Sequence, residues 1–336
     1  MQHRHGRDDV ADAGTFGAGQ LTRRGVLGYT VAGALLPIAA GSSARAEAMA
    51  DPALRAVYRF SLGDMTVTMI DDASFTFPAP AFAANQPEGS IEDFLGRFGL
   101  PTDFVTLHLQ VTLVQSGGAT VLIDTGMGDV TFPGNQPDNG RLLRSLAAVG
   151  VAAEDVTHVI LSHGHPDHIG ACALGGAPTF PKAAYFMPPK ELEFWTAKPG
   201  PDPSFANFML GVGNAQLEPV RDRIRPYKDG DRIAPGITAV AAPGHTLDHH
   251  AFLLEGGGRA VLHMVDAAVH WLVGPEEPEW ALAVEMDPTA AVATRRKLFG
   301  MAAARHLPVI GYHFPFPGIG MVVEEGAGWR FVPVSI

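Results

Sequence analysis

Short apolar runs rich in β-branched residues recur along the chain, which is typical of β-strands. Strands are predicted at residues 58–62, 65–70, 105–115, 120–124, 156–161, 183–187, 237–241, 251–254, 260–265 and 307–311. Helices are predicted at residues 139–149, 188–195 and 288–305. The order of strands followed by a helix occurs twice, which favours an α/β fold with two sheets and helices on the outside.

Two longer segments show neither pattern. Residues 72–102 carry five phenylalanines among prolines and alanines, which predicts a long loop with a short helix near 91–98. The aromatic side chains of this loop could cover a site or form a separate hydrophobic cluster. Residues 196–214 are rich in Pro, Phe, Met and Gly, and we expect them to be a variable insert that shapes access to a site.

Composition excludes some functions. The formal net charge of −11 disfavours nucleic acid as a partner, because phosphate binding requires clustered Lys and Arg. The only cysteine, Cys172, has no partner for an intramolecular disulfide. It lies four residues after His168, and we expect it to be an apolar helix residue rather than a metal ligand.

The start of the chain has the features of an export signal. Residues 22–27, Thr-Arg-Arg-Gly-Val-Leu, resemble a twin-arginine motif, and an apolar stretch and the sequence Ala44-Arg45-Ala46 follow. We therefore expect residues 1–46 to be a signal peptide that is cleaved near Ala46 after the twin-arginine machinery exports the protein to the periplasm. The apolar stretch is shorter than the roughly 20 residues of a membrane span, so no stable membrane anchor is expected, although an uncleaved anchor is the alternative. Residues 47–336 are then one domain.

The segment His163-Gly164-His165-Pro166-Asp167-His168 places three imidazoles and a carboxylate within six residues, directly after a predicted strand. Imidazole nitrogen and carboxylate oxygen are good ligands for zinc, and also for manganese, iron or cobalt. The alternative is a polar loop whose histidines hydrogen-bond locally. Three further candidates, His245, Asp266 and His313, each follow a β-rich apolar run and so are expected along one edge of a sheet.

In combination, the H-x-H-x-D-H motif and the later His, Asp and His resemble the signature of the metallo-β-lactamase superfamily over roughly residues 56–334. The resemblance implies a four-layer αββα sandwich. The metal ligands that it implies are His163, His165 and His245 for a first ion, Asp167, His168 and His313 for a second, and Asp266 as a bridge between the two. The residue before the bridging Asp is commonly Gly in this superfamily, whereas here it is Val265.

The resemblance also implies a hydrolase with two divalent metal ions, Zn²⁺ first, with Mn²⁺, Fe²⁺ or Co²⁺ as alternatives. A hydroxide that bridges the two ions would attack the substrate, because paired dications lower the pKa of a shared water. Asp167 and Asp266 are therefore the candidate catalytic residues. Gly164 is expected to let the backbone come close to the metal.

Several residues are expected to support this site. In the superfamily the aspartate of the D-T-G sequence, here Asp124, orients a ligand histidine; a turn-forming Asp is the alternative. His249 matches the second histidine of a G-H-T-x-x-H pattern and is expected to be a supporting residue. His263 is expected to be a hydrogen-bonded core histidine. His270 and Trp271 could line the substrate pocket or make plain loop contacts.

Within the superfamily the chain resembles the group of methyl parathion hydrolase and related lactonases. The residues that carry this resemblance are the leader, the opening at 58–68 and the ending at 313–320, in which Phe314 and Phe316 are expected near the pocket. The resemblance implies hydrolysis of a small lactone, aryl ester or organophosphate triester. Alternatives are a periplasmic metallo-β-lactamase, a glyoxalase-type thioester hydrolase and a non-catalytic metal-binding protein. A homodimer is compatible with the sequence.

Overall fold

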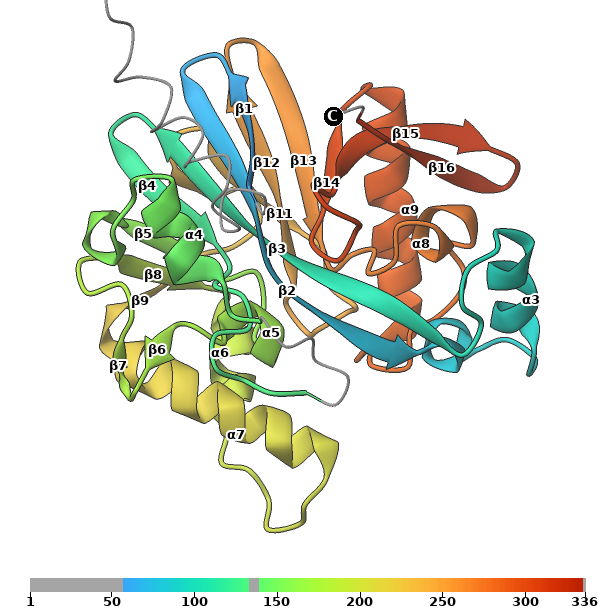
Figure 1. Ribbon diagram of the computed structural model, residues 1–336, viewed down its shortest axis with the longest axis horizontal. Coiled ribbons are helices and arrows are strands. Elements are labelled where there is room, and N and C mark those ends of the chain that lie inside the picture. Colours follow the sequence, from blue (N-terminus) through green and yellow to red (C-terminus); the bar gives the residue numbers. More distant parts are fainter. Residues whose placement is uncertain (1–56, 133–138, 335–336) are drawn as a thin grey trace, which may run out of the picture. The chain divides into compact units, whose positions relative to one another are not determined.

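Two seven-stranded β-sheets form the middle of the fold within residues 57–132 and 139–334, the part of the chain that the computed structural model describes (Figure 1). These residues belong to one unit, Arg45–Ile336. The expected signal peptide at 1–46 lies outside the described residues. None of the described helices has the length and apolar character to cross a membrane.

The first sheet consists, in spatial order, of β1 (Val57–Leu62), β2 (Met65–Pro78), β3 (Phe104–Ser116), β4 (Ala119–Ile123), β5 (His158–Ile160), β8 (Ala184–Met187) and β9 (Ile224–Pro226). The second consists of β10 (Arg232–Ala234), β11 (Ile237–Ala241), β12 (His250–Gly256), β13 (Arg259–Val265), β14 (Val309–Gly311), β15 (Ile319–Glu325) and β16 (Gly328–Pro333). A short hairpin joins β6 (Ala173–Leu174) and β7 (Ala177–Pro178). The pairs β4–β5, β5–β8, β8–β9 and β13–β14 are parallel, and the other pairs are antiparallel.

The α-helices of the described residues are α3 (Ser90–Arg97), α4 (Leu142–Ala148), α5 (Pro166–Ile169), α6 (Pro189–Trp195), α7 (Phe205–Leu217), α8 (Val273–Glu276) and α9 (Pro288–Ala304). Short 3₁₀-helices lie at Ala79–Ala83, Ala153–Asp155 and Glu218–Arg223. The expected helices at 139–149, 188–195 and 288–305 correspond to α4, α6 and α9.

Alternate side chains of the strands face different layers, because successive residues of a strand point to opposite faces of a sheet. On β4, Val121 and Ile123 lie in the hydrophobic cluster to which both sheets contribute, whereas Leu122 packs with residues of α4 and α6. On β13, Leu262 and Met264 pack with residues of α9, which also contacts β15 (Figure 1). The layers are therefore helix, sheet, sheet and helix, and the predicted αββα sandwich is confirmed.

Three local expectations were wrong. Strand β2 continues to Pro78, which pairs with Phe104, so the first part of the expected 72–102 loop is a strand. The strand at 307–311 was expected to be the final one, but the hairpin of β15 and β16 follows it and forms the edge of the second sheet. Cys172 is buried, but it lies in a turn after α5 and not in a helix. The short helix expected near 91–98 is present as α3.

A buried arginine fastens α9 to the loops around Asp266. The Arg295 guanidinium donates to the backbone oxygens of Ala267 (3.1 Å), Pro278 (2.8 Å) and Trp280 (3.0 Å) and pairs with the carboxylate of Glu285. Both side chains of the ion pair are almost fully buried. Removing one partner of this ion pair would leave the other partner as a buried charge with no opposite charge beside it.

We expect Arg295→Met to lower the free energy of unfolding by about 3–5 kcal/mol, the usual result of breaking a buried ion pair. Denaturation in urea measures this change. The neighbouring Arg296 provides the control, because its ion pair with Glu279 (2.7 Å) is exposed and Arg296→Met should change stability by less than about 1 kcal/mol. Equal effects of the two substitutions would contradict the role given to Arg295.

Candidate metal centre

All seven residues that the sequence singled out as candidate ligands lie just after the end of a strand or between two strands. His163, His165, Asp167 and His168 follow β5, and the last two belong to α5. His245 lies between β11 and β12, Asp266 directly follows β13, and His313 follows β14. The strands of both sheets thus bring together residues that are up to 150 positions apart in the chain.

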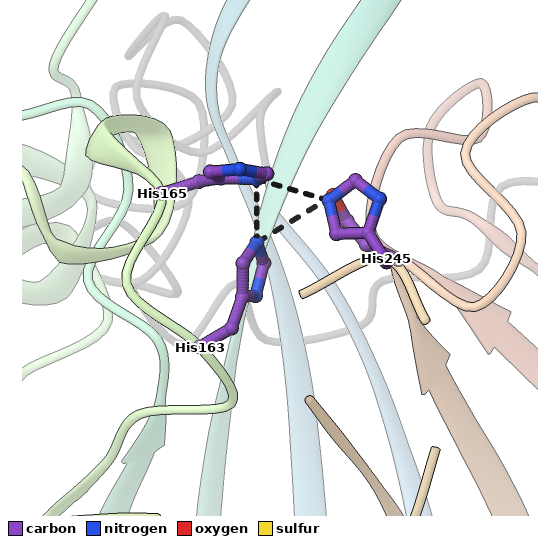
Figure 2. Close-up of side chains that lie close together, drawn as sticks. His163, His165 and His245 are labelled. Carbon is purple, nitrogen blue, oxygen red and sulfur yellow. Dashed lines mark hydrogen bonds and ion pairs between the residues drawn. The ribbon is translucent and has the colours of Figure 1, made fainter. Parts of the chain in front are cut away.

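The first cluster contains His163, His165, His245 and Asp266. The Nδ1 atom of His165 lies 3.0 Å from Nε2 of His163 and 2.9 Å from Nε2 of His245. Figure 2 shows the three rings pointing their nitrogens toward one common point. Asp266 Oδ2 lies 3.2 Å from Nε2 of His245 and 3.9 Å from Nε2 of His163.

The second cluster contains Asp167, His168 and His313. Oδ2 of Asp167 lies 3.8 Å from Nε2 of His168 and 3.5 Å from Nε2 of His313. The same oxygen of Asp266 that faces the first cluster lies 3.3 Å from Nε2 of His168 and 3.1 Å from Nε2 of His313. Asp266 therefore stands between the two clusters, and the grouping is the one that the family resemblance implies.

The chemistry of these atoms fits two metal ions. Two ligands about 2.0–2.1 Å from a tetrahedral Zn²⁺ are about 3.3 Å apart, close to the nitrogen separations in the first cluster. Nε2 of His168 and Oδ1 of Asp266 are buried and have no hydrogen-bond partner. Such groups are costly to bury unless something binds them, and a cation satisfies them. The seven residues could hold two ions, with Asp266 shared.

Outer hydrogen bonds fix which ring nitrogen faces the centre. Asp124 accepts from Nδ1 of His168 (2.8 Å) and from the hydroxyl of Ser162 (2.8 Å), which in turn is 2.9 Å from Nδ1 of His163. The backbone oxygen of His108 accepts from Nδ1 of His313 at 2.8 Å. In each of these histidines Nδ1 is engaged outside, so Nε2 is the nitrogen that faces the centre. Asp124 thus lies where it was expected, beneath a candidate ligand histidine.

Burial and neighbouring charges set the protonation of the clusters. Burial lowers the pKa of His163 and of His165 well below 6.5, so both rings are neutral and can donate a lone pair. Burial would also lower the pKa of His168, but Asp266, Asp167 and Asp124 raise it well above 6.5. Burial opposes ionisation of Asp266, but His168 and His313 lower its pKa well below 3.8.

Glu191 on α6 has a part in the site that sequence reasoning missed. Its Oε2 accepts from the backbone N–H of Gly164 (3.2 Å) and from the indole N–H of Trp195 (2.7 Å), and its Oε1 accepts from the backbone N–H of Asp248 (2.8 Å). The carboxylate is buried and therefore ties the loop of His163 and His165 to the loop after His245. No motif marks this glutamate, because its main partners are backbone groups far away in the sequence.

The structure gives a packing reason for a glycine at position 164. A Cβ on Gly164 would lie 2.1 Å from Cδ1 and 2.3 Å from Cγ of Trp195, so it would overlap with the ring of that buried side chain. The Trp195 ring also packs edge-on against His165 at 5.2 Å between centroids. Gly164 is therefore needed to make room for Trp195, and the expected close approach between its backbone and a metal stays a prediction.

A cavity of about 490 Å³ opens onto both clusters, and five of the seven residues line it: His165, Asp167, His245, Asp266 and His313. The other walls are mainly apolar and include Phe75, Phe77, Phe82, Phe104, Phe132 and Phe205. Segment 72–102 thus contributes Phe75, Phe77 and Phe82, while its Phe94 packs against Trp280 elsewhere. The 196–214 segment contributes Phe205 and Met209 from α7.

The expected pocket residues Phe314, Phe316, His270 and Trp271 do not belong to this lining. Phe314 is fully buried in the cluster with α9 and packs against Phe331, and Phe316 packs against the cluster between the sheets. Nδ1 of His270 accepts from the backbone N–H of Val273 (3.1 Å), and Trp271 packs against the core. Their apolar or amphipathic character serves the interior of the fold. His263 is a buried strand histidine bonded to Thr112, as expected.

Comparison with known proteins identifies the family. Residues 108–313, which hold every candidate ligand, match the metallo-beta-lactamase superfamily. The chain therefore belongs to this superfamily.

Three individual relatives share between 23% and 28% of their sequence with this chain. A probable metallo-hydrolase of Mycobacterium tuberculosis is 28% identical over 186 residues, which are 49% of this chain and 58% of the relative, so the chain spans less than two thirds of that protein. The N-acyl homoserine lactonase AttM of Azorhizobium caulinodans is 27% identical over 62% of this chain and 79% of that protein. The solved structure of AidC, a dizinc quorum-quenching lactonase, superposes with a TM-score of 0.76 over 83% of this chain and 98% of AidC at 23% identity, which shows a shared fold.

Proposed function

We propose that this protein is a metal-dependent hydrolase that cleaves a neutral, ester-like bond in a small apolar molecule: a lactone, an aryl ester or an organophosphate triester. One observation carries the proposal. The seven-residue centre opens onto a cavity whose remaining walls are almost entirely aromatic and aliphatic. Similarity to the AttM lactonase supports the reaction class.

The charge of the cavity favours neutral substrates. Among the described residues, no Lys or Arg lines the cavity, and the charged side chain that it has outside the centre is the acidic Asp103. A substrate whose anionic group lies in the apolar part of the cavity, away from the centre, would lose its hydration without gaining an ionic partner, which costs several kcal/mol. This disfavours β-lactam drugs, which carry a carboxylate, and anionic thioesters.

The residues of the chain have distinct tasks in this reaction. Two divalent ions, when bound, would lower the pKa of a water and polarise a carbonyl or phosphoryl oxygen. The seven side chains His163, His165, Asp167, His168, His245, Asp266 and His313 would hold these ions. Asp124 keeps His168 in the required tautomer, and the phenylalanines orient the apolar substituent and exclude bulk water.

A pair of substrates that differ only in charge tests the proposal. We expect kcat/KM for 4-nitrophenyl hexanoate to exceed that for the 4-nitrophenyl half-ester of adipic acid by about 100-fold or more, since both have six acyl carbons and only the second carries a carboxylate. A 100-fold difference corresponds to about 2.7 kcal/mol, within the penalty for an unpaired buried charge. Chelator-treated protein is the control for hydrolysis without metal.

The wider panel of lactones, aryl esters, phosphotriesters and cephalosporins identifies the substrate class. The highest kcat/KM is expected for one of the first three classes. Faster turnover of a cephalosporin than of every neutral substrate, or equal turnover of the two matched esters, would contradict the proposal and favour a β-lactamase.

We also propose that the protein reaches the periplasm through the twin-arginine pathway. The motif with Arg23 and Arg24, followed by an apolar stretch and Ala44-Arg45-Ala46, supports this proposal. Replacement of both arginines by lysine is expected to abolish export, with full-length protein remaining in the cytoplasm on fractionation. Unchanged periplasmic accumulation of that variant would rule the pathway out.

A further inference from the structure

The backbone directly before Asp266 adopts a conformation that its side chain disfavours. Val265 has φ +49°, in the left-handed region. Val265 is β-branched and fully buried, and left-handed backbone in such a residue is a true outlier that costs about 1–3 kcal/mol. The pairing of β13 with β14 shifts its register between His263 and Val265. Something in the surrounding structure must hold this bend.

One candidate is His263, two residues earlier on β13. Its Nδ1 accepts the backbone N–H of Val265 at 3.2 Å, and its Nε2 lies 3.0 Å from the hydroxyl of Thr112 on β3. Because Nδ1 accepts, the proton of the neutral ring lies on Nε2 and is donated to Thr112. Burial lowers the pKa of His263 to about 3, which agrees with a neutral ring.

His249, between β11 and β12, does the same for the next residue. Its Nε2 accepts the backbone N–H of Asp266 at 3.2 Å, and its Nδ1 lies 3.0 Å from the backbone oxygen of Ala242. Here the proton must lie on Nδ1 and the lone pair on Nε2, the opposite tautomer to that of His263. Burial lowers the pKa of His249 well below 6.5.

We propose that His249 and His263 are positioning residues that together accept two successive backbone N–H groups, those of Val265 and Asp266, and so hold the left-handed bend that aims the Asp266 carboxylate between the two clusters. The inference rests on one part of the proposed function, namely that the two clusters bind metal ions. It assigns neither histidine to the metal or to the substrate. With glycine before the aspartate the bend would carry no steric penalty, whereas Val265 makes it depend on these two acceptors.

The opposite tautomers allow a crossed test with Asn and Gln. The amide of Asn reaches the position of histidine Nδ1, and the amide of Gln reaches that of Nε2. His263→Asn can therefore still accept from Val265, whereas His263→Gln can keep only the bond to Thr112. At the other position the order reverses, because His249→Gln can still accept from Asp266, and His249→Asn can keep only the bond to Ala242.

The readout is the affinity of the purified protein for Zn²⁺, measured in competition with a chelating dye, together with the absorption spectrum of the Co²⁺-loaded protein. We expect His263→Gln and His249→Asn to lose about 10–100-fold in metal affinity, the usual effect of removing an outer partner of a metal ligand. His263→Asn and His249→Gln should stay within about threefold of the unsubstituted protein and keep its Co²⁺ spectrum. Adding Val265→Gly to His263→Gln should recover part of the loss, because glycine adopts the bend without strain.

Two merely structural histidines would not give this crossover, since Asn and Gln would then rank in the same order at both positions. The inference would be overturned if Asn and Gln ranked in the same order of metal affinity at both positions. It would also be overturned if His263→Gln lost as much metal affinity with Val265→Gly as without it. If a variant at one position misfolds, the reverse of the expected order of Asn and Gln at the other position would still overturn the inference. Metal affinity is measured without substrate, so failure of the proposed hydrolase activity would not affect this test.

Discussion

Asp266→Ala is expected to lower kcat/KM by at least about 10³-fold and to reduce the metal content of the purified protein. The carboxylate oxygen of Asp266 lies 3.1–3.3 Å from His168, His245 and His313, and these histidines come from both clusters. A ligand shared by two ions serves both, so its loss exceeds the 10–100-fold effect that is typical of an outer partner. Elemental analysis and kinetics on the best substrate measure the two effects.

The control for this substitution is Asp64→Ala in the exposed turn between β1 and β2. It removes the same functional group far from the cavity and should change neither metal content nor activity. Wild-type turnover by Asp266→Ala, with both ions still bound, would show that Asp266 is not shared between the clusters.

Gly164→Ala is expected to have the second-largest effect. The added methyl group would lie 2.1–2.6 Å from three ring atoms of Trp195, whose side chain is buried and held by Glu191. Neither partner can move without shifting the loop of His163 and His165. We expect at least a 100-fold loss of metal affinity and a loss of stability of about 1–3 kcal/mol from overpacking.

A second substitution tests whether the loss of metal affinity in Gly164→Ala comes from the clash with Trp195. Trp195→Ala removes the ring that the methyl group meets, so the double variant should bind metal more tightly than Gly164→Ala alone. Gly96→Ala in α3 is the matched control, because the nearest atom to its new methyl group would be 3.8 Å away. If Gly164→Ala binds metal as well as Gly96→Ala does, the packing argument is wrong.

The sequence predicted the layers and the cluster residues for a physical reason. His163, His165, Asp167 and His168 are close along the chain, and the other three candidates follow clear apolar runs, so their place at strand ends could be inferred. Strands such as β4 and β13 are nearly continuous apolar runs, because one face packs on the other sheet and the other face packs on helices.

Apart from the supporting roles of Asp124 and His249, the sequence did not predict the contacts that hold the centre. Glu191 and Arg295 bind mainly backbone groups that are distant in the chain, and no residue type marks such partners. Phe314 was wrongly assigned to the pocket because an apolar side chain beside a ligand can face either the cavity or the core. The extension of β2 was missed because prolines and alanines surround its phenylalanines.

The metal content of the purified protein tests the central claim most directly. Seven convergent side chains predict two divalent ions per chain, activity that a chelator removes and activity that added metal restores. Full activity in metal-free protein, or saturation at fewer than two ions with full activity, would contradict a centre in which Asp266 serves two ions.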